Sequence, residues 1–155
     1  MNFRIPLAVL AAAAALCAFA ADNFSAPPPA TPTAAERLAN ARKAIEAKDF
    51  ARAIRDLESA ARDEPNNFDV QNLLGYSYRK RENPDLKKAF AHYNNALKID
   101  PRNPYVHEYI GEAYLMDRKP AEAEKHLAQL EAICGKGCDE YKDLAKAIAA
   151  YKAKN

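Results

Sequence analysis

The chain has 155 residues, of which 49% are hydrophobic and 28% charged, and its formal net charge is +2. This length is typical of one domain. Acidic and basic residues are interspersed, so the one-signed patch that nucleic acid requires is missing, and we expect no nucleic-acid partner. The four glycines, the ten prolines and the lack of alternating β-branched runs argue against sheets.

Residues 1–20 have the pattern of a signal peptide. Arg4 gives a positive start, an apolar run follows, and Ala18-Phe19-Ala20 forms a small-x-small cleavage site. We therefore predict cleavage after Ala20 and a periplasmic or secreted protein that touches the membrane only transiently during export. Two alternatives stay open. An uncleaved anchor would need a longer apolar run, and a lipoprotein would need a small residue where Leu16 precedes Cys17.

Residues 21–33 are rich in proline and alanine and are predicted to be a disordered linker. Three consecutive prolines favour an extended polyproline II conformation, and the segment has little apolar material to pack. A proline-rich ligand for a partner is the alternative reading. At its end, Thr33 is a suitable N-cap for a first helix, and Glu36 completes a capping box.

Residues 68–101 contain two helical patterns separated by a polar turn. The small residue Gly75 is expected to let the two helices approach closely, with Tyr93 filling the space between Ala89 and Ala96. Asp100-Pro101 ends the second helix, because a residue before proline is pushed away from helical dihedrals.

The same landmarks recur along the chain. Moving back 34 positions from Gly75 gives Ala41, moving forward 36 gives Gly111, and a further 34 gives Ala145. The two extra residues of the middle repeat fall in the turn at 82–85, where an insertion disturbs no packed face. By analogy, Gly111 should hold the two helices of its own repeat close together.

The landmarks from Leu74-Gly75 to Asp100-Pro101 closely resemble the tetratricopeptide repeat (TPR) signature. The resemblance implies an all-α array of TPR-type helical hairpins wound into a right-handed superhelix. It implies a domain over residues 34–151, with repeats at about 34–67, 68–103 and 104–137 and a capping helix at about 138–153.

Cys134 and Cys138 flank Gly135-Lys136-Gly137, between the third repeat and the capping helix. An even cysteine count after signal removal favours a disulfide in an exported protein. A redox-active pair is the alternative, although such pairs are more often spaced C-x-x-C.

A metal site is not predicted. It would need further ligands, and the three histidines share no ligand spacing with the cysteines. His107 is expected to be a packing or interface histidine.

Function is expected to come from binding. The sequence has no glycine-rich phosphate loop, H-E-x-x-H or serine elbow, so we predict neither an enzyme nor a cofactor. The resemblance implies a concave groove that binds a protein partner, through either an extended peptide or a helix of that partner. Its predicted binding residues lie on the first helices of repeats two and three: Asp69, Asn72, Tyr76, Arg79, Tyr105, Glu108 and Glu112. The alternatives are a structural or assembly spacer of an envelope complex and a thiol-redox protein.

Overall fold

The structure is a computed structural model that describes residues 31–154. The predicted signal peptide and most of the predicted linker therefore lie outside the described residues. Within residues 31–154 every regular element is an α-helix, and none of these helices is long and apolar enough to cross a membrane. The helices are α1 (Ala34–Glu46), α2 (Phe50–Asp63), α3 (Phe68–Lys80), α4 (Leu86–Ile99), α5 (Pro104–Met116), α6 (Pro120–Cys134) and α7 (Asp139–Lys154).

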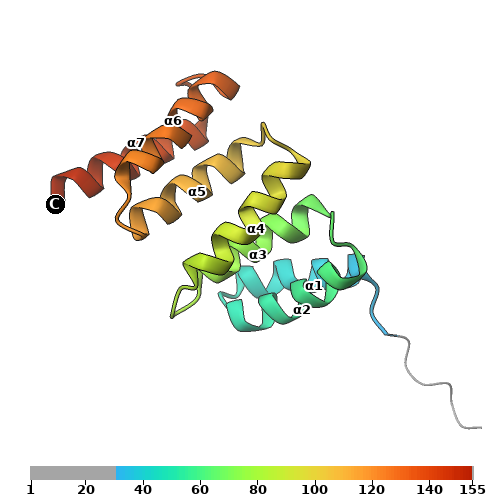
Figure 1. Ribbon diagram of the computed structural model, residues 1–155. Helices are drawn as coiled ribbons and strands as arrows, with labels where there is room; N and C mark the ends of the chain where they lie inside the picture. Colours follow the sequence, from blue (N-terminus) through green and yellow to red (C-terminus); the bar gives the residue numbers. More distant parts are fainter. Residues whose placement is uncertain (1–30, 155) are drawn as a thin grey trace, which may run out of the picture. The chain divides into compact units, whose positions relative to one another are not determined.

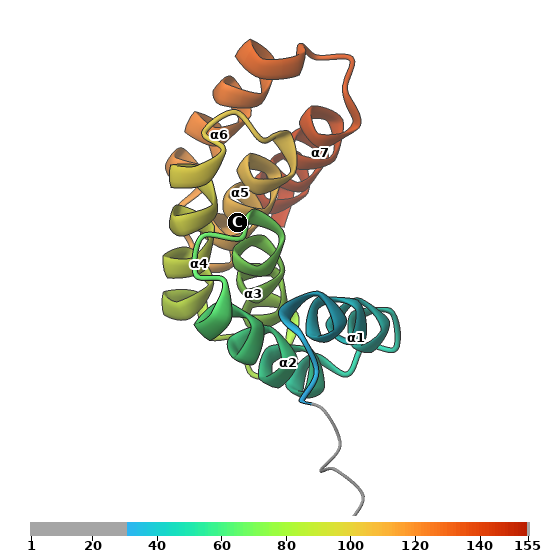
Figure 2. The ribbon, with the colours of Figure 1, turned by 90° about the vertical axis from the view of Figure 1, so that its right-hand side faces the viewer.

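These helices form three antiparallel hairpins followed by α7 (Figure 1). Figure 2 shows α2, α4 and α6 along one side of the stack, with α1, α3, α5 and α7 along the other. Both the all-α fold class and the hairpin array were predicted from the sequence, and both are confirmed. We call the side of the stack that α1, α3, α5 and α7 share the first-helix side.

Side-chain caps begin most of the helices. At Thr33 the predicted capping box is present, since the Glu36 amide donates to Thr33 Oγ1 at 3.2 Å and the Thr33 amide donates to Glu36 Oε2 at 2.7 Å. The Thr33 amide and the Thr33 hydroxyl both donate to Glu36 Oε2, and these bonds hold the pKa of Glu36 below its ordinary value. Asp49 and Asp85 each cap the second helix of a hairpin, where the side chain accepts from the amide three residues on, at Arg52 and Lys88. The hairpins thus start where local chemistry satisfies free amide groups.

Two of the hairpin turns have the same geometry. After α1, the Lys48 amide donates to Ile45 O and the Asp49 amide donates to Ala44 O, which is the Schellman pattern. The turn after α5 repeats this pattern, with Arg118 in the position of Lys48. Both residues have positive φ, 59° and 58°, although neither is glycine.

The middle hairpin turn is longer. Residues 81–85 connect α3 to α4, whereas residues 47–49 and 117–119 connect the other two pairs. The predicted two-residue insertion in this turn is therefore confirmed. Asp85 still caps α4, and its amide donates to Tyr78 O at 3.0 Å, so the extra residues leave both helix ends intact.

Small residues set the closest approaches between helices. A Cβ atom at Gly75 would lie 2.5 Å from Tyr93 ring atoms on α4, as expected for the two helices of one repeat. At Gly111 the expectation was wrong, because a Cβ there would lie 2.5 Å from Leu144 on α7. Gly111 therefore admits the seventh helix, and the packing of α5 against α6 depends on other residues.

The buried apolar residues form two clusters. The larger one extends from Ala34 on α1 to Ala113 on α5, and the smaller one joins Leu115 at the end of α5 to α6 and α7. Helix α7 contributes the buried side chains of Leu144 and Ile148 to the smaller cluster. Helix α5 thus belongs to both clusters and connects them.

Candidate functional site

A buried arginine with aromatic neighbours joins α3 to α5 on the first-helix side. The Arg79 side chain lies beside two neighbouring tyrosine rings, with Cζ 5.5 Å from the Tyr76 centroid and 5.3 Å from the Tyr109 centroid. Its Nε donates to the Tyr93 hydroxyl at 3.3 Å, and its Nη1 forms an ion pair with Glu112. We call these five residues the Arg79 cluster.

The Arg79 cluster keeps a charged group inside the protein. Arg79 is only 4% exposed. Burial opposes its charge, but the neighbouring Tyr93 and Glu112 favour the charged form and raise the pKa of Arg79. Burial also raises the pKa of Tyr109 to about 12, with contributions from nearby acidic groups. The guanidinium is therefore engaged within the chain, and it is not presented on an open groove surface.

Glu108 differs from the Arg79 cluster because its carboxylate has no partner. It is half-buried and makes no hydrogen bond or ion pair within residues 31–154. Burial and, after it, the negative charges of Glu112, Asp143 and Glu140 together raise the pKa of Glu108 to about 7, although the nearby charge of Arg79 lowers it. We call these four acids the acidic edge. A cation or a hydrogen-bond donor placed here would relieve the cost of ionising Glu108.

The other predicted binding residues are in different environments. Tyr105, one turn before Tyr109, is 54% exposed. Asp69 forms a solvent-exposed ion pair with Arg42 at 3.0 Å, which joins α3 to α1. Asn72 is 9% exposed, and its Oδ1 has no hydrogen-bond partner in the described part of the chain. The most accessible aromatic surface near the acidic edge is therefore Tyr105.

Sequence reasoning did not include two members of the Arg79 cluster among the binding residues. Tyr109 lies four residues after Tyr105 and three before Glu112, so helical spacing alone places all three on one face. Tyr93 was predicted only as a packing residue, and its buried hydroxyl also serves as the acceptor for Arg79. A buried tyrosine needs a hydrogen-bond partner for its hydroxyl, so the burial predicted for Tyr93 already indicated a polar neighbour.

Cys134 and Cys138 are paired at the junction of α6 and α7, with their Cα atoms 5.9 Å apart. A side-chain oxygen of Glu140 lies within 4.8 Å of both sulfurs. Such a trio could hold a metal ion only with free thiols, because paired sulfurs provide no thiolate ligand. Cys134 is exposed, and the pair lies close to the acidic edge through Glu140.

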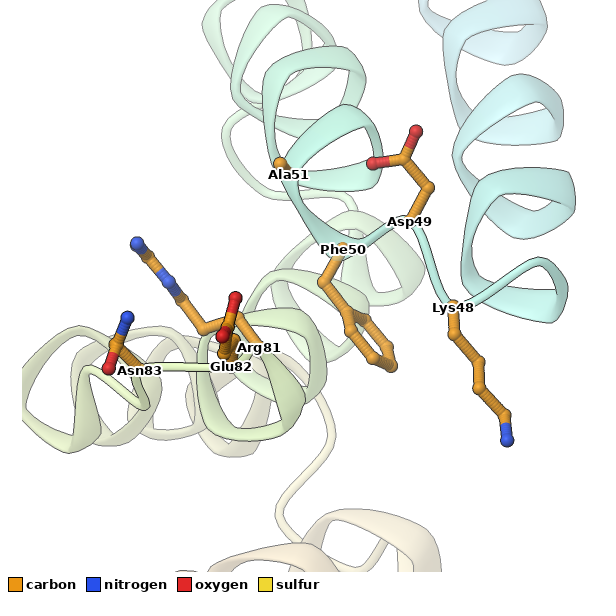
Figure 3. A pocket seen from close by; sticks show the side chains of 7 residues that line it. All are labelled: Lys48, Asp49, Phe50, Ala51, Arg81, Glu82 and Asn83. Atoms are coloured by element: carbon orange, nitrogen blue, oxygen red, sulfur yellow. The ribbon is translucent and has the colours of Figure 1, made fainter.

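A pocket of about 250 Å³ lies between the turn after α1 and the turn after α3, and the ring of Phe50, which lines it, has its centroid 6.2 Å from that of Tyr76. Figure 3 shows Phe50 pointing downwards between these turns, while the side chains of Lys48 and Arg81 point away from each other. Polar groups that fix a small ligand normally converge on it. The charged groups here diverge, so this pocket is a weaker candidate than the surface of α5.

Comparison with known proteins agrees with this architecture. A family described as "TPR repeat" matches residues 79–117. The Yersinia enterocolitica type III secretion translocator chaperone SycD is similar in structure, with a TM-score of 0.67 and 16% identity, covering 83% of this chain and 98% of SycD.

The first TPR domain of human RPAP3 is also similar, with a TM-score of 0.63 and 17% identity over 79% of this chain and 98% of that domain. No curated protein matches the sequence. The matched residues cover the end of α3 and all of α4 and α5, and they include every member of the Arg79 cluster except Tyr76. The described part of the chain is therefore an all-α array of TPR-type helical hairpins.

Proposed function

We propose that this protein is a non-catalytic interaction adaptor that binds a peptide or a partner helix along the first-helix side. The observation that carries the proposal is the pairing of an exposed aromatic ring with an unpartnered acid on α5, namely Tyr105 and Glu108. The fold supports it as well, because similar structures include a chaperone and a TPR domain. Stacked helical hairpins offer an extended surface of this kind.

The charges on this face favour one type of partner. Arg79 is already neutralised by Glu112, so the other acids of the acidic edge leave the surface beside α5 and α7 negative. A partner segment with a lysine or arginine next to an apolar side chain would place its cation near Glu108. Its apolar group would then cover Tyr105, whose rigid ring loses little entropy when held.

Export is the second part of the proposal. A signal peptide cleaved after Ala20 would deliver the protein to the periplasm or outside the cell, where Cys134 and Cys138 would persist as a structural disulfide. Intact-mass measurement of protein from its native compartment tests this. We expect a chain beginning at Ala21 with no free thiol. A mass that retains residues 1–20, or that shows two reduced cysteines, would refute this part.

The binding surface is tested with a partner captured from the native compartment. Isothermal titration of that partner should show that Tyr105→Ala weakens binding by about 1–2 kcal/mol, as for an interface anchor. Glu108→Gln should weaken binding most at low salt, because it removes a screened charge interaction. Asn94→Ala, an exposed change on α4, and Glu46→Gln, an exposed change on α1, are the matched controls.

Circular dichroism should show that all four variants are folded, since each changed side chain is at least partly accessible. If Tyr105→Ala and Glu108→Gln both bind with wild-type affinity, the proposed surface is wrong. The protein would then be better explained as a spacer that positions other parts of an assembly.

A further inference from the structure

Two histidines face each other between α5 and α6. His107 and His126 have their Nδ1 atoms 3.0 Å apart, and their ring centroids are 5.2 Å apart. His107 is buried, as expected for an interface histidine, whereas His126 is half-buried and gives the pair one edge towards solvent. The pair lies outside both the Arg79 cluster and the acidic edge.

The surroundings determine which nitrogen of His107 carries its proton. His107 Nε2 lies 3.0 Å from the carbonyl oxygen of Pro101. A carbonyl oxygen only accepts, so Nε2 donates, and the Nδ1 of the neutral ring is left with a free lone pair. That lone pair is on the atom facing His126. Without a ligand, His126 Nδ1 satisfies it by donating a hydrogen bond.

A change of tautomer at His126 would give two facing lone pairs. We propose that His107 and His126 form a binding site for a divalent transition-metal ion of the Ni²⁺ or Cu²⁺ class, coordinated through both Nδ1 atoms. Imidazole nitrogens are well suited to these ions. The hydrogen bond from His107 to Pro101 O has the role of the outer contact that typically orients a metal-bound histidine.

The separation of the two nitrogens favours a particular geometry. With metal–nitrogen bonds of about 2.0–2.1 Å, two nitrogens 3.0 Å apart subtend about 95° at the ion. This angle is close to that between neighbouring ligands in the tetragonal sites of Ni²⁺ and Cu²⁺. The ring centroids are 5.2 Å apart, so the two Nδ1 atoms now point almost directly at each other, and both rings would tilt to place an ion beside the line that joins them.

The surroundings of the pair are compatible with binding, because His126 is only half-buried and leaves the pair one edge towards solvent from which an ion could enter. Glu122 lies one turn before His126 on α6, and its negative charge interacts with the imidazole ring of His126. It now pairs with Lys125 at 2.7 Å and could turn to supply a further ligand. Water would fill the remaining positions.

The test uses the full chain without a histidine tag and Ni²⁺ as the probe, because Ni²⁺ is not reduced by thiols. Isothermal titration at pH 7.5 should show one site in the wild type and at least a tenfold weaker affinity in both His126→Gln and His107→Gln. His92→Gln is the matched control, since His92 is half-buried and contacts Gln71 elsewhere in the array. It should bind Ni²⁺ like the wild type.

A second measurement avoids any effect of the variants on folding. In wild-type protein, substoichiometric Ni²⁺ should broaden the ring NMR signals of His107 and His126 before those of His92. The proposal is overturned if the His92 signals broaden first or if no histidine signal broadens. It is also overturned if folded His126→Gln protein binds Ni²⁺ as tightly as the wild type.

Discussion

Replacing Gly75 by alanine should destabilise the array, even though alanine is the better helix former. In an exposed helix the change would stabilise by about 1 kcal/mol. Here the added Cβ would lie 2.5, 2.5 and 2.9 Å from three atoms of the Tyr93 ring. That ring is fully buried, and its hydroxyl is held by Arg79, so it cannot easily move away. Overpacking of this kind costs about 1–3 kcal/mol. We expect Gly75→Ala to lose about 1–2 kcal/mol after the gain in helix propensity.

Gly111→Ala provides the comparison, because its new Cβ would meet a flexible side chain. The nearest atoms are the two methyl carbons of Leu144, at 2.5 and 2.6 Å. A leucine can change rotamer where a tyrosine ring cannot, so the net loss should be smaller, within about 1 kcal/mol of the wild type. Gly137→Ala has no neighbouring atom within 4 Å and serves as the control.

The assay is urea unfolding followed by circular dichroism, which reports the free energy of unfolding for each variant. The expected order of stability is Gly137→Ala, then Gly111→Ala, then Gly75→Ala. A Gly75→Ala protein as stable as the wild type would refute the reasoning, because it would mean that the Tyr93 ring is free to yield. A larger loss at Gly111 than at Gly75 would refute it equally.

Three further predictions follow from charges and turns. Glu108 has a raised pKa in the folded state, so the folded protein should lose stability as pH rises from about 4.5 to about 7, and urea unfolding of Glu108→Gln should show a weaker loss over that range. Lys48→Gly should raise the free energy of unfolding by about 0.5–1 kcal/mol by removing strain at positive φ, whereas Ala47→Gly, at negative φ, should not. Arg79→Ala should lower the free energy of unfolding by about 2–4 kcal/mol, because Glu112 and the Tyr93 hydroxyl lose their partner. A loss below about 0.5 kcal/mol, which is ordinary for a surface substitution, would contradict a structural role.

Local chemistry made much of the fold predictable from the sequence. The Thr33 capping box, the end of α4 at Asp100-Pro101 and the long turn before Asp85 depend on residues near each other in the chain. The contact between Gly75 and Tyr93 was also predictable, because it lies within one repeat of known spacing.

Contacts between repeats were harder to predict. Nothing in the local pattern indicates that Gly111 meets Leu144 on α7, because the sequence does not specify how closely the seventh helix packs against α5. The same holds for Arg79. The TPR resemblance implied a residue that faces the groove, whereas its environment depends on Tyr109 and Glu112 of the next repeat. Burial of a long charged side chain is decided by such distant partners.

The long turn between α3 and α4 has a practical consequence. Residues Arg81 to Pro84 are exposed, and the bonds that end α3 and begin α4 involve Arg81 and Asp85, which leaves residues 82–84 free of them. Loop length carries little thermodynamic cost, about 0.6 kcal/mol for each doubling. A short epitope or a fluorescent reporter inserted between Glu82 and Asn83 should therefore leave the hairpins intact. It would provide a handle for capturing a partner or for following its arrival without altering the surface of α5.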